Sequence, residues 1–261
     1  MSSQIPEDPI ELIAISDPGE KDKENHLWSD RLVVNVANVV AWLFPVLILA
    51  IVSQVILRKM GLNQAWLDDA QWWMYGFAMV VGFAYAITTS SHVRVDILHQ
   101  HFSSKKKAKV EIFALGWLLL PFLGIMADVL MHYAYSSWVA SEGSDSPNGL
   151  HKLYLLKMSL PVLFVLAMVA AFSSLYRNLA LISKPAIWKI CIGALPIIWF
   201  LCERLSYYCM WWYTHFTQPD LHVRRIPREP LLEYSTWVGL GVVIVVFVIS
   251  IAKNWQNHRE V

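Results

Sequence analysis

Six stretches of the sequence are long, apolar and almost free of charged residues. A helix that crosses the hydrocarbon core of a bilayer needs about 20 such residues, each adding about 1.5 Å. Of the 261 residues, 56% are hydrophobic and only 16% are charged, which predicts an all-α integral membrane helical bundle. The six predicted spans are Leu32 to Leu57, Trp73 to Thr89, Ile112 to about Met131, Leu160 to Leu175, Ile187 to Leu205 and Tyr234 to Ala252.

The fifth of these stretches has the shortest uncharged part, the 13 residues from Ile190 to Cys202. Lys189 precedes this part, and Glu203 follows it. The stretch therefore spans a membrane only if Lys189 extends its ammonium group to the interface.

The distribution of lysine and arginine predicts the orientation of the chain. The loop from Ser90 to Glu111 is the richest in these residues and should be cytoplasmic. Six spans place 13 basic residues on that side and 8 outside, whereas five spans place 15 and 6. The count alone favours five. We expect six, with both termini in the cytoplasm, because Lys184 and Pro185 precede a new helix and the aromatic stretch from Tyr207 to Phe216 suits an outer interface.

The chain divides into three parts by composition. Residues 1–30 are rich in acids and turn-forming residues, which predicts a disordered acidic cytoplasmic tail. Residues 31–182 hold four of the spans, and residues 183–261 form an extension with two further spans. No internal repeat or pair of broken helices marks two inverted halves, so the sequence does not predict a complete secondary transporter.

Polar residues inside the predicted spans are few. Asp128 and His132 lie four residues apart on one face of the third span, and Asp128 is about 27 Å along a helix that enters at Val110. A hydrogen-bonding pair near the outer boundary is therefore favoured over an ion or proton site. Asn35 and Asn38 in the first span could hydrogen-bond to a neighbouring helix, a contact worth about 0.6 to 2 kcal/mol.

Motifs that carry catalysis or bind a cofactor are absent from the sequence. It has no nucleophile elbow, no HExxH pair and no phosphate-binding glycine loop. Haem ligation needs two histidines deep in facing helices, and only His132 lies within a predicted span. A net charge of +1 argues against a nucleic-acid partner. We therefore expect neither an enzyme nor a cofactor.

The loop after the second span, SSHVRVDILHQHF, alternates polar His92, Arg94 and Asp96 with valines. An extended turn would put the polar groups on one side. Asp96 could then cap a short amphipathic helix from Ile97 to about Lys109, whose lysines face lipid headgroups at the membrane surface. A basic topology loop without such a helix is the alternative.

Four segments of the sequence resemble, in order, the small membrane subunit of tripartite ATP-independent periplasmic (TRAP) transporters, the DctQ-like family. The most specific is HVRVD, His92 to Asp96, which is similar to the family's loop between the second and third helices. The resemblance covers roughly residues 30 to 182, and the extension has no counterpart in it. The other three segments are QVILRKMG with Arg58, AWLDDAQWW with Trp66 and Asp69, and SEGSDSPNGL with Glu142 and Gly149, followed by Pro161 opening a span.

The resemblance implies a non-catalytic small permease subunit of a sodium-coupled transporter for organic acids in the bacterial inner membrane. Its implied partners are the large elevator-type permease subunit (M), the periplasmic substrate-binding protein (P) and membrane lipid. It also implies structural roles for Arg94 with Asp96 at the cytoplasmic interface and for Arg58 with Asp69 on the outer side. The alternative is a redox or cytochrome-type membrane subunit that uses His132 and other histidines.

Overall fold

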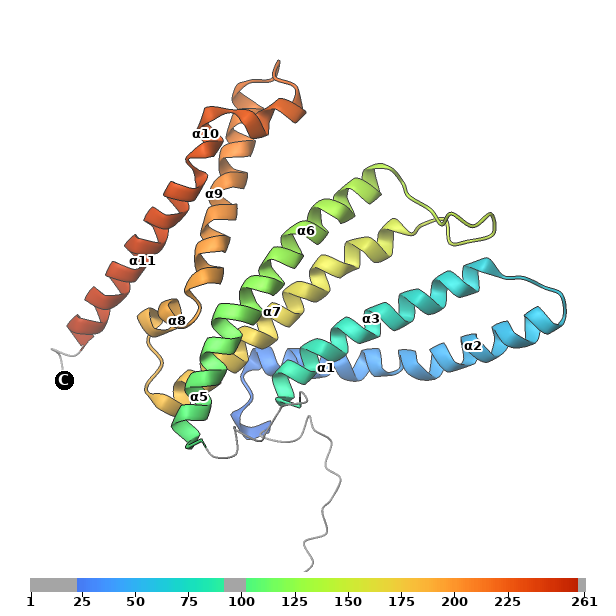
Figure 1. Ribbon diagram of the computed structural model, residues 1–261, viewed down its shortest axis with the longest axis horizontal. Coiled ribbons are helices and arrows are strands. Elements are labelled where there is room, and N and C mark those ends of the chain that lie inside the picture. Colours follow the sequence, from blue (N-terminus) through green and yellow to red (C-terminus); the bar gives the residue numbers. More distant parts are fainter. Residues whose placement is uncertain (1–22, 92–101, 258–261) are drawn as a thin grey trace, which may run out of the picture.

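The computed structural model describes residues 23–91 and 102–257. Helices α1 to α7 form a bundle, and α9 and α11 form a hairpin that leans beside it (Figure 1). These residues contain no strand, so the prediction of an all-α membrane helical bundle is confirmed. The elements are η1 Lys23–Asn25, α1 Trp28–Ala41, α2 Leu43–Lys59, α3 Ala65–Thr89, α5 Ser104–Phe113, η2 Ala114–Leu119, α6 Leu120–Val139, α7 Tyr154–Ile182, α8 Ile187–Gly193, α9 Leu195–Thr217, η3 Val223–Arg228, α10 Pro230–Glu233 and α11 Ser235–Asn257.

Four helical segments of the described part of the chain are long and apolar enough to cross a membrane. They are Trp28–Lys59, Ser104–Val139, Tyr154–Ile182 and Ser235–Trp255, and α8 with α9 is a fifth if that bent pair counts as one span. Helix α3 is not in this set, but its 25 residues extend for about 37 Å alongside α7 and α1. The chain is a multi-pass membrane protein.

Helix α7 lies at the centre of the bundle, where it packs against α1, α3, α5 and α6. Its inner face is built from small side chains, and Ala167, Ala170 and Ala171 are fully buried. Small residues let membrane helices approach closely, so that dispersion contacts accumulate where no hydrophobic driving force exists between helix and lipid. Leu120 and Leu123 of α6 fill the opposite side of this core and are also fully buried.

The first helix begins earlier than the sequence predicts. Residues 1–22 of the predicted tail lie outside the described residues, whereas residues 23–30 form η1 and the first turn of α1. Asp30, expected in the tail, is fully buried in the bundle. The tail boundary at residue 30 is therefore wrong, because a buried acid at the helix start looks like one more member of an acidic run.

The third span is one long helix from Ser104 to Val139. The predicted surface helix ending near Lys109 is wrong in its second half, because Lys105 to Lys109 belong to the first turns of this span; residues 97–101 lie outside the described residues. The π-helical segment η2 interrupts the span at the point where the extension packs on it. π-Bulges of this kind re-aim side chains within a helix.

The fourth span also begins before the sequence predicts. Helix α7 starts at Tyr154, and Pro161 lies inside it instead of opening it. The fifth predicted span is corrected too, since Ala194 separates α8 from α9 with a bend of 93°, and α9 continues to Thr217. Pro196 occupies the first turn of α9, where its missing amide costs no hydrogen bond.

The extension packs closely on η2 and α6. A β-carbon added to Gly116 would lie 1.8 Å from the carbonyl oxygen of Gly193, and one added to Gly124 would lie 2.3 Å from Cδ1 of Ile197. Trp117 Nε1 donates to the carbonyl of Ile192 at 3.2 Å. These contacts join the first turns of the extension to the third span.

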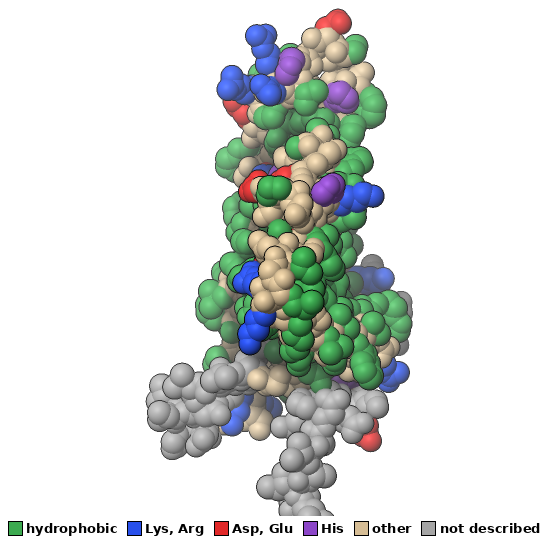
Figure 2. Space-filling view, turned by 90° about the vertical axis from the view of Figure 1, so that its right-hand side faces the viewer, with side chains coloured by type: hydrophobic (Ala, Val, Ile, Leu, Met, Phe, Trp, Pro, Cys, Tyr) green, Lys and Arg blue, Asp and Glu red, His purple; other side chains and the backbone are tan. Residues whose placement is uncertain are grey.

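Much of the helical surface is apolar and exposed. Helix α2 buries only Gln54, while large side chains such as Ile48 and Leu49 are 61% and 67% exposed. In the space-filling view, hydrophobic side chains cover the helix flanks, and charged side chains gather toward the ends (Figure 2). This distribution is what a membrane protein presents to lipid or to the helices of another subunit.

We predict that Gly116→Ala destabilises the protein by about 1–3 kcal/mol, because its methyl group would overlap backbone atoms that cannot move aside as a side chain can. Gly76→Ala is the matched control, since a β-carbon there meets nothing within 4 Å. Thermal unfolding in detergent micelles measures both variants. Equal midpoints for the two would contradict the close contact between η2 and the extension.

Candidate functional site

The polar side chains of the helices form three groups of contacts that join different elements. At the α2–α3 end, Arg58 Nη2 lies 2.9 Å from Asp68 Oδ2. Gln54 also donates to Asp68, and Gln71 Nε2 donates to Gln54 Oε1 at 2.6 Å. The sequence reading expected Asp69 to act with Arg58, so the partner of Arg58 is corrected to the neighbouring carboxylate.

Asp69 instead ties α3 to the loop between α6 and α7. Its Oδ2 accepts from the backbone amide of Leu150 at 2.9 Å. A β-carbon on Gly149 would lie 2.6 Å from this carboxylate and 2.3 Å from Ser144 Oγ, so glycine is needed for the close approach. Two segments that resemble the family, AWLDDAQWW and SEGSDSPNGL, therefore meet here.

The same loop carries a second ion pair at the end of α6. Lys157 Nζ lies 2.6 Å from Glu142 Oε1, and Ser137 Oγ donates to Glu142 Oε2 at 2.6 Å. The ammonium group also lies 4.4 Å from the ring centroid of Tyr133. The hydrogen bonds from Lys157 and then Ser137 lower the pKa of Glu142 below its ordinary value.

At the opposite end of the bundle, Arg177 joins α1, α3 and α7. Its Nε lies 3.5 Å from Oδ2 of the fully buried Asp30, and its Nη2 donates to the carbonyl of Thr88 at 2.6 Å. Asp30 Oδ2 also accepts from the amide of Leu27 at 2.9 Å. A buried carboxylate without a counter-charge is costly, so this contact fixes the start of α1.

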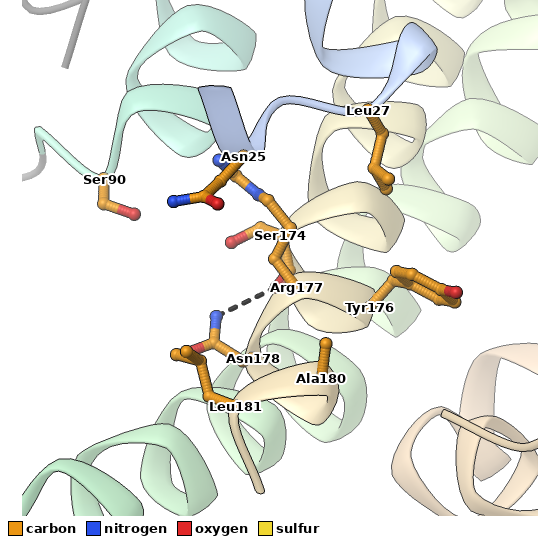
Figure 3. A pocket seen from close by; sticks show the side chains of 9 residues that line it. All are labelled: Asn25, Leu27, Ser90, Ser174, Tyr176, Arg177, Asn178, Ala180 and Leu181. Atoms are coloured by element: carbon orange, nitrogen blue, oxygen red, sulfur yellow. Dashed lines mark hydrogen bonds between the residues drawn. The ribbon is translucent and has the colours of Figure 1, made fainter. Parts of the chain in front are cut away.

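A cavity of about 460 Å³ opens beside Arg177 (Figure 3). Arg177 extends from α7 toward Asn25, whereas Tyr176 points to the other side of the helix. Asn178 Nδ2 donates back to the carbonyl of Ser174 at 2.9 Å and stays on α7. The lining thus consists of side chains already used to hold the helices together.

The third group joins the bundle to the extension and is called here the α6–α9 cluster, composed of Asp128, His132, Glu203, Arg204 and Tyr208. Tyr208 donates to Asp128 Oδ1 at 2.7 Å and lies 3.0 Å from His132 Nε2. Asp128 and His132 therefore meet through the tyrosine hydroxyl and not as the direct pair that their spacing predicts.

Arg204 supplies the positive charge of the α6–α9 cluster. It holds Glu203 with two hydrogen bonds of 2.6 and 2.9 Å and lies 3.7 Å from Asp128 Oδ2. Ser235 at the start of α11 contacts Glu203 Oε1 at 3.3 Å, and Gly239 lies against the backbone of Glu203. One guanidinium group thus links α6, α9 and α11.

The remaining predicted site residues are not brought together. Asn35 and Asn38 lie exposed on α1, and Trp66 Nε1 bonds to Gln64 Oε1 at 2.9 Å on an exposed part of α3. His92, Arg94 and Asp96 lie outside the described residues. Within the described ranges, no three histidine, cysteine or acidic side chains are close enough to hold a metal ion. The polar contacts that the structure describes connect helices.

Sequence reasoning missed Arg177, Asp30 and Tyr208 as members of these contacts. A signal existed for Arg177, because it is a charged residue inside the predicted fourth helix and such residues seek a partner in a membrane. Tyr208 carried no comparable signal, since tyrosines are common in interfacial segments.

We predict that Arg204→Gln lowers stability by about 1–3 kcal/mol, less than for a fully buried pair because the side chain is 31% exposed. Arg204→Lys should lose part of this, since lysine keeps the charge without the two-pronged geometry. Arg31→Gln, an exposed arginine, is the control. Thermal unfolding of the three variants tests this, and an unchanged midpoint for Arg204→Gln would contradict the linking role.

We predict that the Glu142 contact makes stability depend on pH. A carboxyl group whose pKa is lowered by folding contributes stability at pH values above its ordinary pKa of 4.5 and loses it as the pH falls below that value. Glu142→Gln should therefore melt at a lower temperature than wild type at pH 7, and the difference should shrink toward pH 3. A difference that stays constant across this range would exclude the ionised contact.

The comparison with protein families finds one match. The model described as "Tripartite ATP-independent periplasmic transporters, DctQ component" matches residues 47–181, just over half of the chain. The matched region runs from α2 to the last turn of α7, so the extension lies outside it. The comparisons with curated proteins and with solved structures found no match. By its family match, the chain belongs to the DctQ family, a component of TRAP transporters.

Proposed function

We propose that this chain is the non-catalytic small permease subunit of a sodium-coupled TRAP transporter for organic acids. In this role it scaffolds the large elevator-type permease subunit, which receives substrate from a periplasmic binding protein. The family match supports the assignment to a TRAP component. Sodium coupling, the organic-acid substrate and the elevator motion are expectations that come from the family.

The observation that carries the scaffold role is a pair of exposed amides on a membrane helix. Asn35 and Asn38 lie on one face of α1, and within the described residues neither side chain has a hydrogen-bond partner. An amide facing hydrocarbon without a partner is costly. A polar group on a helix of another subunit would remove this cost.

A shallow groove beside Asn38 supports the same surface. It has a volume of about 340 Å³ and lies between α1 and α3, where Ala37, Ala78 and Gly82 contribute to its lining. Small residues of this kind admit the close approach of another helix. The exposed apolar flank of α2 continues this surface.

The other predicted interface residues have a supporting role in this proposal. Arg58, Asp69 and Trp66 would preserve the outer loops that shape the surface for the partner. The roles of His92, Arg94 and Asp96 at the cytoplasmic interface stay a prediction.

We further propose that the chain lies in the bacterial inner membrane with both termini in the cytoplasm. Support comes from the lysines at the start of α5 and from the arrangement in Figure 1, where α1 begins and α11 ends on the same side of the molecule as α5 begins. In this orientation residues 31–182 form the family domain, and residues 183–261 add a hairpin that crosses the membrane twice.

We predict that replacing Asn35 and Asn38 by leucine weakens copurification with the large permease subunit by about threefold to thirtyfold for each asparagine. Val39→Leu, at a position 72% exposed on the same helix, is the control. Affinity capture of the tagged chain from membranes that contain both subunits measures the effect.

Undiminished capture of the large subunit by the double variant would exclude this face of α1 as the interface. Absence of the large subunit from the wild-type capture would overturn the proposed function. A haem absorption band in the purified wild-type chain would support the redox alternative instead.

A further inference from the structure

The connection between α9 and α11 is an ordered structure in place of a short turn. Elements η3 and α10 lie between the two helices and both pack against α9. Ile226 is fully buried and Leu232 is 4% exposed, so each anchors one of the two elements. Pro227 and Pro230 restrict the backbone further. The outward face of this connection is therefore held in a fixed position.

Three arginines occupy that outward face. Arg224, Arg225 and Arg228 are all exposed, and within the described part of the chain their guanidinium groups make no ion pair or hydrogen bond. Figure 2 shows basic side chains gathered at the top of the molecule, at the height of this connection. Such a cluster without internal partners is an electrostatic docking surface for an anionic group.

Exposed aromatic side chains lie next to the arginines. On α9, Trp212 is 50%, Tyr213 is 62% and Phe216 is 75% exposed. On α11, Tyr234 is 62% and Trp237 is 71% exposed. Tryptophan and tyrosine collect at the level of lipid headgroups, where their rings contact chains and their polar atoms contact water.

The apolar span of α11 ends at the same level. It runs over Ser235–Trp255, and Ser235 contacts Glu203 in the middle of α9. The second half of α9, with η3 packed on it, therefore extends past the end of the apolar span. This places the arginines just beyond the hydrocarbon, where lipid phosphates lie.

We propose that Arg224, Arg225 and Arg228 form a binding site for the phosphate groups of anionic phospholipids. Guanidinium groups match phosphate oxygens with paired hydrogen bonds, and the adjacent aromatic rings would contact the upper acyl chains. The aromatic belt favours a lipid over the acidic surface of a soluble protein. This site would anchor the tip of the extension independently of the permease partner.

The test uses the full chain in nanodiscs of phosphatidylcholine with a minor share of phosphatidylglycerol. The probe is phosphatidylglycerol with a photoreactive headgroup, compared with the matching phosphatidylcholine, and the readout is crosslinking to the peptide that spans η3. Each arginine near an anionic surface is worth about fivefold. We expect the wild type to favour phosphatidylglycerol by about tenfold or more, and the Arg224→Ala, Arg225→Ala, Arg228→Ala variant to lose most of this preference.

Two controls separate this site from general charge effects. The double variant Lys59→Ala, Lys152→Ala removes two exposed lysines elsewhere and should leave the η3 crosslink unchanged. Crosslinking near Lys105 serves as an internal reference and should be equal in all variants, which also shows that the triple variant is folded in the membrane.

Three results would overturn the proposal. The first is an unchanged lipid preference at η3 in the triple variant. The second is displacement of phosphatidylglycerol from the wild type by millimolar inorganic phosphate, which would identify the ligand as the free ion. The third is a triple variant that keeps its lipid preference but no longer copurifies with a soluble protein, which would identify a protein ligand.

Discussion

The cost of an unpaired charge in a membrane governs how the helices of this protein are joined. The described spans contain few ionisable side chains, and those that face other helices meet a counter-charge there. Arg177 reaches Asp30 and the carbonyl of Thr88 at one end of the bundle, and Arg204 reaches Asp128 and Glu203 near the other. Because each contact crosses between helices, these few pairs set which helices are neighbours and at what height.

The same constraint explains why the chain suits a scaffold. Its own polar groups are largely used to hold its helices together, and no aligned set of ionisable residues within the described part of the chain marks a path for a solute. What remains on the outside is apolar surface, interrupted on α1 by Asn35 and Asn38. A partner helix is the element that such a surface lacks. The extension adds to this body through the close contact of Gly116 with Gly193 and through the α6–α9 cluster.

The apolar runs were sufficient to predict the fold class, since each predicted span coincides with helix. Boundaries were less predictable where a local event decides them, such as the bend at Ala194 or the continuation of α7 through Pro161. Partner choice was not predictable, because Asp68 and Asp69 are adjacent in sequence yet point to Arg58 and to Leu150. Tyr208 joins Asp128 to His132 from a helix 80 residues away along the chain, and no local pattern encodes such a contact.

Sodium-dependent uptake of an organic acid into proteoliposomes tests the central claim most directly. The assay compares this chain alone, the large permease subunit alone and the two together, each with the periplasmic binding protein present. The scaffold account predicts no uptake by this chain alone and full uptake only when both membrane subunits are present. Uptake by this chain alone, or full uptake by the large subunit without it, would contradict the account.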